Sequence, residues 1–339
     1  MNSNQFWDRY RRVLQVGLFA LVIGAFPIFD QSAYHLAIMI QIGTFAIIVI
    51  GLNLVMGYAG QISLGHAAFY GLGAYTSALL TVHLGLYPWL AMLIGAILTG
   101  LIAFVIGIPI FRLKGHYLAM ATLGFGVIVH LAFKEFFKEL TGGPTGLPGV
   151  PRLTIGTFVF DNDVKYYYLV WFFVVVILSL ALNIVNSRVG RALRSIHGSE
   201  IAAETLGVDT ARYKLQVLVV SAIFASLAGS LRTHYNLHVS PASFTFISSI
   251  ELVVMAAVGG LASIWGAPFG AGVVYLIRPL MREVMPRLLN FRSGEHELIA
   301  YGIILVLIMI FMPEGLTAGT VQAYRRWRAR REAREYVPT

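Results

Sequence analysis

The chain has 339 residues, of which 58% are hydrophobic before its 34 glycines are counted, and only 12% are charged. An average soluble domain is roughly 45–50% apolar with glycine included and about 25% charged, so this composition excludes a soluble globular protein. The chain has no cysteine, which excludes disulfides, thiolate metal sites and thiol nucleophiles. Its formal net charge of +9 is concentrated towards the two ends, next to apolar segments.

Arginines stand close to the first and last apolar segments, at Arg9, Arg11 and Arg12 and at six positions from Arg325 to Arg334. The positive-inside rule therefore places both termini in the cytoplasm and requires an even number of crossings. The first apolar run, at 13–29, is long for a signal peptide and no A-x-A cleavage site follows it, so it predicts a retained span. The basic residues near the C-terminus favour contact with anionic lipid over nucleic acid.

In chain order, apolar runs predict spans at 13–29, 34–56, 62–82, 88–111, 117–137, 166–185 and 215–235, two passes or an entry and return within 247–277, and a last span at 298–312. We therefore expect an all-α, polytopic integral membrane protein with ten transmembrane helices. Arg278, Arg282, Arg287 and Arg292 would then lie outside, against the positive-inside rule, so eight or nine crossings are the alternative.

These spans divide the chain into a cytoplasmic N-terminal segment at 1–12, a transmembrane domain at 13–316 and a basic cytoplasmic tail at 317–339. The connection at 138–165 is rich in glycine and proline, so it cannot form one regular helix, and the parity of crossings makes it a periplasmic loop. The connection at 187–214 is the longest on the cytoplasmic side, and its excess of basic residues agrees with that side.

The segment at 53–80 reads NLVMGYAGQISLGHAAFYGLGAYTSALL and has small residues at helical spacing. Gly60, Ser63, Ala67, Gly71, Ala74 and Ala78 would form one stripe along a helix, against which another helix can pack closely. The alternative is a broken or hinged helix beside a solute path, formed by Asn53, Gly57, Gly60, Gln61, Ser63, Gly65 and His66. Irregular backbone is tolerated in a membrane only inside protein or beside water.

Three further candidates for the solute path are Glu251, Gly259 and Gly260. A carboxylate near an apolar span is costly, although solvation at the outer end of the span would also account for Glu251. The two glycines mark the turn between two passes. Gly60, Ser63, Ala67 and Phe69 recur as Gly260, Ser263, Ala267 and Phe269, at a constant offset of 200. This offset suggests an internal repeat of the kind that transporters use, although both segments would cross in the same direction.

The cytoplasmic connection has the signals of a short capped helix. Ser199 can cap a helix of about two turns that begins at Glu200 and ends at Gly207, and Asp209 or Thr210 can cap the next span. Its apolar residues include Ile201 and Leu206, and its polar side carries Glu200 and Glu204. A helix that lies on the membrane usually has Lys and Arg on its polar face, so this acidic helix favours docking of another protein.

Several motifs are absent from the sequence. The chain has no Gly-Lys dipeptide and so no Walker A loop to bind nucleotide phosphates, which means that any ATPase that drives transport is another chain. It also lacks H-E-x-x-H and Gly-x-Ser-x-Gly motifs, so a zinc-dependent or nucleophile-elbow enzyme has no support. We therefore expect no catalytic residue, metal or cofactor in this chain.

Five stretches, in this order, resemble the membrane permeases of ABC importers for branched-chain amino acids, and the LivM-like of the two permease types in particular. They are the segment 53–80 quoted above, LTGGPTGLPGVP at 140–151, VGRALRSIHGSEIAAETLGVDTARYKLQVLVVSAIFASLAGSL at 189–231, ELVVMAAVGGLASIWGAPFGA at 251–271 and YGIILVLIMIFMPEGL at 301–316. The departures from the family pattern are His197, Gly198 and Pro144.

The resemblance implies a bacterial cytoplasmic membrane importer that works by alternating access. It implies two cytoplasmic ABC ATPases, a second homologous permease in a heterodimer, a periplasmic or lipid-anchored solute-binding protein, and an amino-acid substrate. The connection at 189–214 would be the loop that couples to the ATPases, with Arg191, Ser199, Glu200, Ala203, Glu204 and Gly207 as its candidate residues.

Other functions remain open at this point. Related permeases are thought to carry urea, short amides or other amino acids, and the Gly-His-Ala-Ala run at 65–68 favours amino acids. A secondary transporter driven by an ion gradient would be expected to bury carboxylates at mid-membrane, and only Glu251 is a candidate. A scaffolding protein would leave the Gly-Pro loop and the capped helix unexplained.

Overall fold

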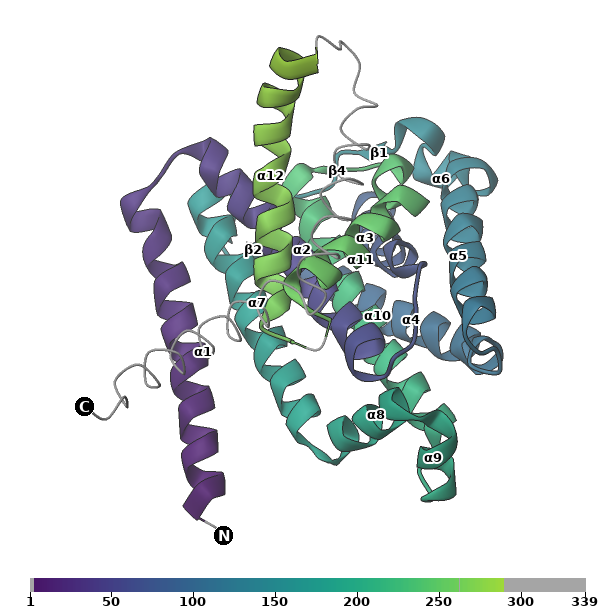
Figure 1. Ribbon diagram of the computed structural model, residues 1–339. Coiled ribbons are helices and arrows are strands. Elements are labelled where there is room, and N and C mark those ends of the chain that lie inside the picture. The colour runs from purple at the N-terminus through teal and green to yellow at the C-terminus, as the bar shows by residue number, and fades with distance from the viewer. Residues whose placement is uncertain (1–2, 262, 290–339) are drawn as a thin grey trace, which may run out of the picture.

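The computed structural model describes residues 3–261 and 263–289, with side chains described at 13–261 and 263–277. The predicted last span at 298–312 and the basic tail at 317–339 lie outside the described residues. The described chain is mainly helical, and its helices form one bundle (Figure 1).

Nine long helices make up the bundle: α1 (Ser3–Phe29), α2 (Ala33–Asn53), α3 (His66–His83), α4 (Pro88–Ile110), α5 (His116–Leu131), α7 (Asp163–Asn186), α10 (Thr210–Asn236), α11 (Phe246–Gly259) and α12 (Gly266–Leu289), counted over residues 3–261 and 263–289. Wider π-helical turns extend α2 through η1 (Leu54–Tyr58) and α5 through η2 (Ala132–Phe136). The short helical elements are α6 (Lys138–Thr141), η3 (Gly143–Thr145), α8 (Arg188–Gly198), α9 (Glu200–Thr205) and η4 (Pro241–Phe244).

Five helical segments are long and apolar enough to cross a bilayer, namely Ala33–Tyr58, Pro88–Ile110, His116–Phe136, Asp163–Asn186 and Thr210–Asn236. Three shorter apolar helices accompany them, at Val13–Phe29, Phe246–Gly259 and Gly266–Ile277. The predicted helices at these positions are confirmed. The region 247–277, for which two passes or an entry and return were predicted, holds the helices α11 and α12, and α12 continues to Leu289.

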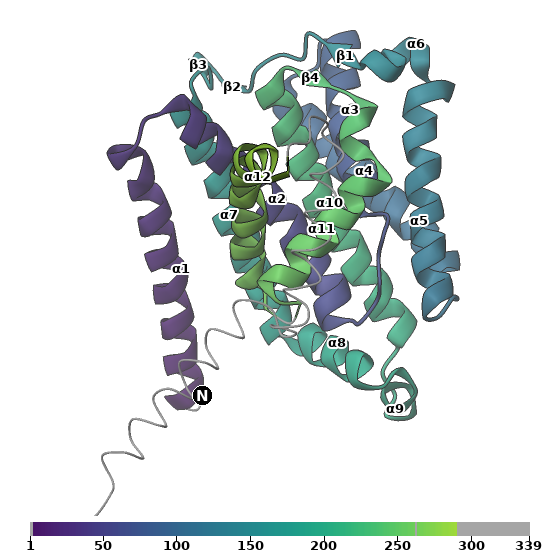
Figure 2. The ribbon, with the colours of Figure 1, turned by 45° about the horizontal axis from the view of Figure 1, so that its top comes forward.

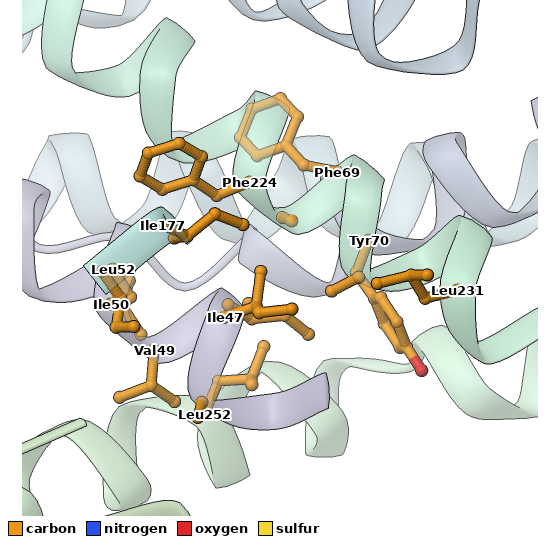
Figure 3. Packing of buried hydrophobic residues seen from close by; sticks show 14 of the residues in the cluster. Ile47, Val49, Ile50, Leu52, Phe69, Tyr70, Ile177, Phe224, Leu231 and Leu252 are labelled. Carbon is orange, nitrogen blue, oxygen red and sulfur yellow. The ribbon is translucent and has the colours of Figure 1, made fainter. Parts of the chain in front are cut away.

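Helix α2 lies at the centre of the bundle. Within its most apolar window 78% of the residues are buried, against 17% in α5, which therefore lies at the edge. Ile47, Ile50 and Leu52 of α2 pack with Ile177, Phe224 and Leu252 in the main hydrophobic cluster (Figure 3). Three further helices supply these partners, so α7, α10 and α11 surround α2.

Helix α1 stands to one side of the bundle and packs mainly on α7 (Figures 1 and 2). The ring of Phe19 contacts Trp171 and Trp265 edge-on, and the hydroxyl of Tyr167 donates to the carbonyl of Ile23 at 2.7 Å. The face of α1 that is turned away from the bundle exposes large apolar side chains, among them Leu18 and Leu21. Such a face suits lipid rather than water.

The connection at 138–165 has no long helix, as predicted. Its strands are β1 (Leu147–Pro148), which pairs antiparallel with β4 (His238–Val239), and β2 (Thr154–Ile155), which pairs with β3 (Phe158–Val159). These strands lie at one end of the bundle, which we name the strand end, and α8 and α9 lie at the other, which we name the α9 end (Figure 2).

The predicted stripe of small residues is confirmed only in its second half. Ala67, Gly71, Ala74 and Ala78 lie on α3, but Gly60 and Ser63 precede the helix. The reason is local, because Gly60 has φ +67 and so ends the preceding helical turn. Within α3 the closest approach is to α10, where a Cβ on Gly73 would lie 2.3 Å from Ser226.

Candidate functional site

The chain between α2 and α3 is broken inside the bundle. The π-helical turn η1 ends at Tyr58, residues 59–65 form no helix, and α3 begins at His66. His66 faces Ser221, which lies eleven residues after the start of α10 at Thr210. The N-terminus of α3 is therefore well inside the bundle and not at its end.

His66 connects the start of α3 to the preceding break and to α10. Its ring is fully buried, its Nδ1 lies 2.9 Å from the Ser63 hydroxyl and its Nε2 lies 2.5 Å from the Ser221 hydroxyl. The next residue, Ala67, donates its N–H to the Ser249 hydroxyl of α11 at 3.2 Å. Both ring nitrogens thus contact hydroxyls, so His66 links the start of α3 to the break and to α10, while the Ala67 N–H links it to α11.

The turn between α11 and α12 packs against the break between α2 and α3. The Asn53 side-chain amide donates to the Ser263 carbonyl at 3.0 Å, and a Cβ on Gly57 would lie only 1.3 Å from the Leu261 carbonyl oxygen. Gly260 ends α11 with φ +105. A Cβ on Gly259 would lie 2.1 Å from the Gly266 carbonyl. These glycines are needed because backbone meets backbone here.

The offset of 200 between the two sequence segments has a structural counterpart. Gly60 and Gly260 both have positive φ, and α3 and α12 begin at the equivalent residues 66 and 266. The Ser63 hydroxyl bonds to the His66 side chain, and the Ser263 hydroxyl accepts from the Gly266 N–H at 3.2 Å. Both helices then run towards the strand end (Figure 1), which is the common direction that the sequence predicts.

The remaining predicted path residues are placed as follows. A Cβ on Gly65 would lie 2.1 Å from the Thr122 carbonyl, so α5 approaches the break closely. Gln61 is partly buried and donates to the nearby Ala59 carbonyl at 2.8 Å. Glu251 lies in the second turn of α11 and is partly buried. The structure thus brings Asn53, Gly57, Gly259 and Gly260 together at one contact, and Ser63, Gly65 and His66 at the start of α3.

The predicted capped helix at the α9 end is confirmed. The Ser199 hydroxyl accepts from the Ala202 N–H at 3.3 Å, α9 spans Glu200–Thr205, and Gly207 follows with φ +82. Asp209 is the cap of α10, since its carboxylate accepts from the Arg212 N–H at 3.0 Å. The sequence analysis missed α8, an amphipathic helix that buries Leu193 and Ile196 and carries the exposed Arg191.

The acidic side of α9 faces the bundle, which the sequence did not predict. Lys214 of α10 is only 2% exposed in its side chain, and its Nζ lies 2.6 Å from a carboxylate oxygen of Glu200. The Thr210 hydroxyl donates to Glu204 at 2.8 Å, and Ala203 of α9 is also buried. The signal that could have revealed this contact is Lys214 itself, a cation directly before the long apolar run of α10.

The apolar side of α9 is turned outwards instead. Ile201 is 71% exposed and Leu206 is 81% exposed, next to the αL turn at Gly207. Two large apolar side chains on a short helix outside the bundle suit contact with another protein. Among the described residues, no group of three His, Asp or Glu side chains could hold a metal ion.

Comparisons with known proteins cover the bundle, the break and the α9 end together. Residues 34–312 match the family model described as the branched-chain amino acid transport system permease component. The chain belongs to this family. It is therefore a permease and a multi-pass membrane protein, and the match spans both the break after Asn53 and the α8–α9 segment. No solved structure matches the chain.

Individual relatives agree with the family. The chain is 33% identical over 310 residues to the high-affinity branched-chain amino acid transport system permease protein LivM of Salmonella typhimurium, which covers 85% of this chain and 70% of the relative. It is 34% identical over 295 residues to LivM of Escherichia coli, with 80% and 67% covered. LivH of Salmonella typhimurium is 25% identical over 293 residues, with 80% and 91% covered. The LivM type is thus the more similar of the two.

Proposed function

We propose that this permease is a membrane-spanning subunit of an ATP-driven importer that carries branched-chain amino acids across the bacterial inner membrane. The observation that carries the proposal is the similarity to permeases of LivM type over 80–85% of the chain. The matched residues include the buried break and the exposed α9. The subunit itself performs no chemistry, and ATP hydrolysis belongs to partner chains.

The proposed topology has ten crossings with both termini in the cytoplasm. The nine described long helices and the predicted span at 298–312 supply this number. The α9 end then faces the cytoplasm and the strand end faces the periplasm. A solute-binding protein would dock at the strand end, two ATPases at the α9 end, and a second homologous permease in the membrane.

The proposed coupling runs from α9 into the centre of the bundle. Ile201 and Leu206 would contact an ATPase, and Glu200 would transmit the movement to Lys214 of α10. The same helix carries Ser221, which is bonded to His66 at the start of α3. A shift of α10 would therefore move the break between α2 and α3, because tightly packed elements shift together as rigid units.

The proposal is tested by uptake of radiolabelled leucine into cells that lack this chain and into cells in which it is restored. We expect uptake to require the chain and to be lost in Gly207→Pro, because proline fixes φ near −65° and the residue here has φ +82. The matched control is Gly207→Asn, since asparagine tolerates positive φ, and it should retain uptake.

Unchanged leucine uptake without the chain would overturn the proposed substrate, and uptake of urea and short amides would be measured next. Leucine uptake that requires the chain, survives Gly207→Pro and collapses when the ion gradient is removed would instead indicate a secondary transporter. Western analysis of the membrane fraction must show equal amounts of each variant, so that loss of uptake is not loss of protein.

A further inference from the structure

Arg232 is a cation inside the bundle that the proposed function has not yet used. It lies on α10 four residues before the helix ends at Asn236, so it sits towards the strand end. The preceding residue, Leu231, is fully buried and its carbonyl accepts from the Tyr166 hydroxyl at 2.5 Å. The backbone around Arg232 is therefore fixed by its packing on α7.

One nitrogen of the Arg232 guanidinium is buried without a hydrogen-bond partner among the residues whose side chains the structure describes. Its Nη1 is buried and donates to no acceptor in the described part of the chain, and no carboxylate among the described side chains forms an ion pair with Arg232. A buried donor without a partner is costly, most of all on a charged group. Ionisable side chains inside membrane spans are rare and mark the pathways of substrates or ions.

An aromatic cluster with side chains from α2, α3 and α12 lies beside this guanidinium. The guanidinium lies 5.8 Å from the centre of the Phe45 ring of α2. The Phe45 ring in turn contacts Tyr70 and Tyr275 of α12, with centroids 6.3 Å and 5.5 Å apart. Tyr70 appears beside Leu231 in Figure 3. We name Arg232, Phe45, Tyr70 and Tyr275 the arginine site.

The helix α11 begins next to the same aromatic cluster. The ring of Phe244 packs edge-on against Tyr70 with centroids 4.9 Å apart, and α11 starts two residues later at Phe246. The N-terminal end of a helix carries a partial positive charge. The Arg232 guanidinium and the N-terminal end of α11 therefore both make the potential at the aromatic cluster positive.

We propose that the arginine site binds the carboxylate of the transported amino acid, with Arg232 as its partner and the aromatic rings against its apolar side chain. A guanidinium binds a carboxylate through two parallel hydrogen bonds, and aromatic rings provide apolar contact without a further charge. The inference rests on the proposed function and narrows it, because urea and short amides have no carboxylate to offer Arg232.

The experiment uses the absence of cysteine from this chain. Phe45→Cys places a single thiol in the arginine site, and the complete importer in membrane vesicles is treated with an anionic or a cationic thiosulfonate reagent. Modification of this chain is followed by mass. We expect the anionic reagent to react about tenfold faster than the cationic one, because a positive site raises the local concentration of anions. Leucine should slow the reaction and leucinamide, which lacks the carboxylate, should not.

Two further variants test Arg232 itself. In the Phe45→Cys background, Arg232→Gln should abolish both the preference for the anionic reagent and the protection by leucine, whereas Arg232→Lys should keep the preference. A thiol at Tyr34, which is 60% exposed on the outer end of the α2 segment, is the matched control and should show neither effect. The comparison of leucine with leucinamide needs no change at Arg232, so it holds even if Arg232→Gln does not assemble.

Equal reaction of the two reagents, equal protection by leucine and leucinamide, or protection that persists in Arg232→Gln would each overturn the inference. Leucine uptake by the unmodified importer is measured in parallel. Loss of protection with uptake intact refutes the arginine site alone, whereas absence of leucine uptake refutes the proposed function.

Discussion

Lys214 is the only Lys, Arg, Asp or Glu residue that is buried among the residues whose side chains the structure describes. Its ammonium group is held by Glu200 at 2.6 Å and lies 5.8 Å from the centre of the Phe111 ring. Glu200 keeps 23% of its side chain exposed, so the two partners are unequal. Removing the charge of Glu200 leaves the buried Lys214 ammonium without a counter-charge. Removing Lys214 leaves the Glu200 carboxylate, which water can still reach.

This asymmetry predicts different effects of Glu200→Gln and Lys214→Met. Glu200→Gln should loosen the attachment of α9 by about 3 kcal/mol, because the buried ammonium loses its counter-charge. Lys214→Met should be close to neutral for stability, since methionine fills a similar apolar volume. The rate of proteolysis between residues 199 and 209 in the purified importer measures how firmly α9 is attached in each variant. Equal rates in the two variants would contradict the prediction, and faster cleavage of Lys214→Met would reverse it.

At the scale of elements, glycine determines how closely the helices approach. A Cβ on Gly229 of α10 would lie 2.1 Å from the Tyr70 carbonyl of α3, and one on Gly270 of α12 would lie 2.0 Å from the Met255 carbonyl of α11. The obstructing atoms are backbone, so no side chain can move aside. In a membrane such contacts replace the hydrophobic effect as a source of association between helices.

Gly229→Ala should therefore destabilise the contact between α3 and α10 by about 2 kcal/mol, in the range of overpacked cores. The matched control is Gly124→Ala on α5, where nothing lies within 4 Å of the new Cβ. Alanine favours the helix by about 0.8–1.0 kcal/mol over glycine, so the control should be neutral or slightly stabilising. The melting temperature of each detergent-solubilised variant measures its stability. A Gly229→Ala protein as stable as Gly124→Ala would disprove the close contact.

The sequence predicted elements whose signals are local and missed contacts between distant residues. Apolar length located the long helices, and the cap signals at Ser199 and Asp209 located the ends of α9 and α10. The bonds from His66 to Ser221 and from Glu200 to Lys214 depend on how helices pack, which no local pattern encodes. The stripe of small residues was overextended because the positive φ of Gly60 is a property of the turn and leaves no mark on residue spacing.

At the scale of the whole molecule, the two ends of the bundle differ in secondary structure and in the side chains that they expose. The strand end consists of short strands and turns, in which Trp89 donates to the Thr154 carbonyl at 2.8 Å and Lys165 pairs with Asp161 at 2.7 Å. The side-chain hydrogen bond from Lys165 is the main cause that lowers the pKa of Asp161 below its usual value. The α9 end instead projects a helix with exposed apolar residues. The two ends of the bundle therefore present surfaces of different chemistry, polar at the strand end and apolar at the α9 end.

The orientation of these ends is tested by single thiols in a chain that has none of its own. Ile155→Cys lies on β2 at the strand end, where the residue is 55% exposed, and Leu206→Cys follows α9, where it is 81% exposed. A thiol reagent that cannot cross the inner membrane should label Ile155→Cys in intact cells and Leu206→Cys only after permeabilisation, because the positive-inside rule places the α9 end in the cytoplasm. A thiol at Ile97, which is 63% exposed on the apolar surface of α4, should react slowly in both conditions because lipid covers it. The reverse pattern would invert the proposed topology and with it the assignment of α9 to the ATPases.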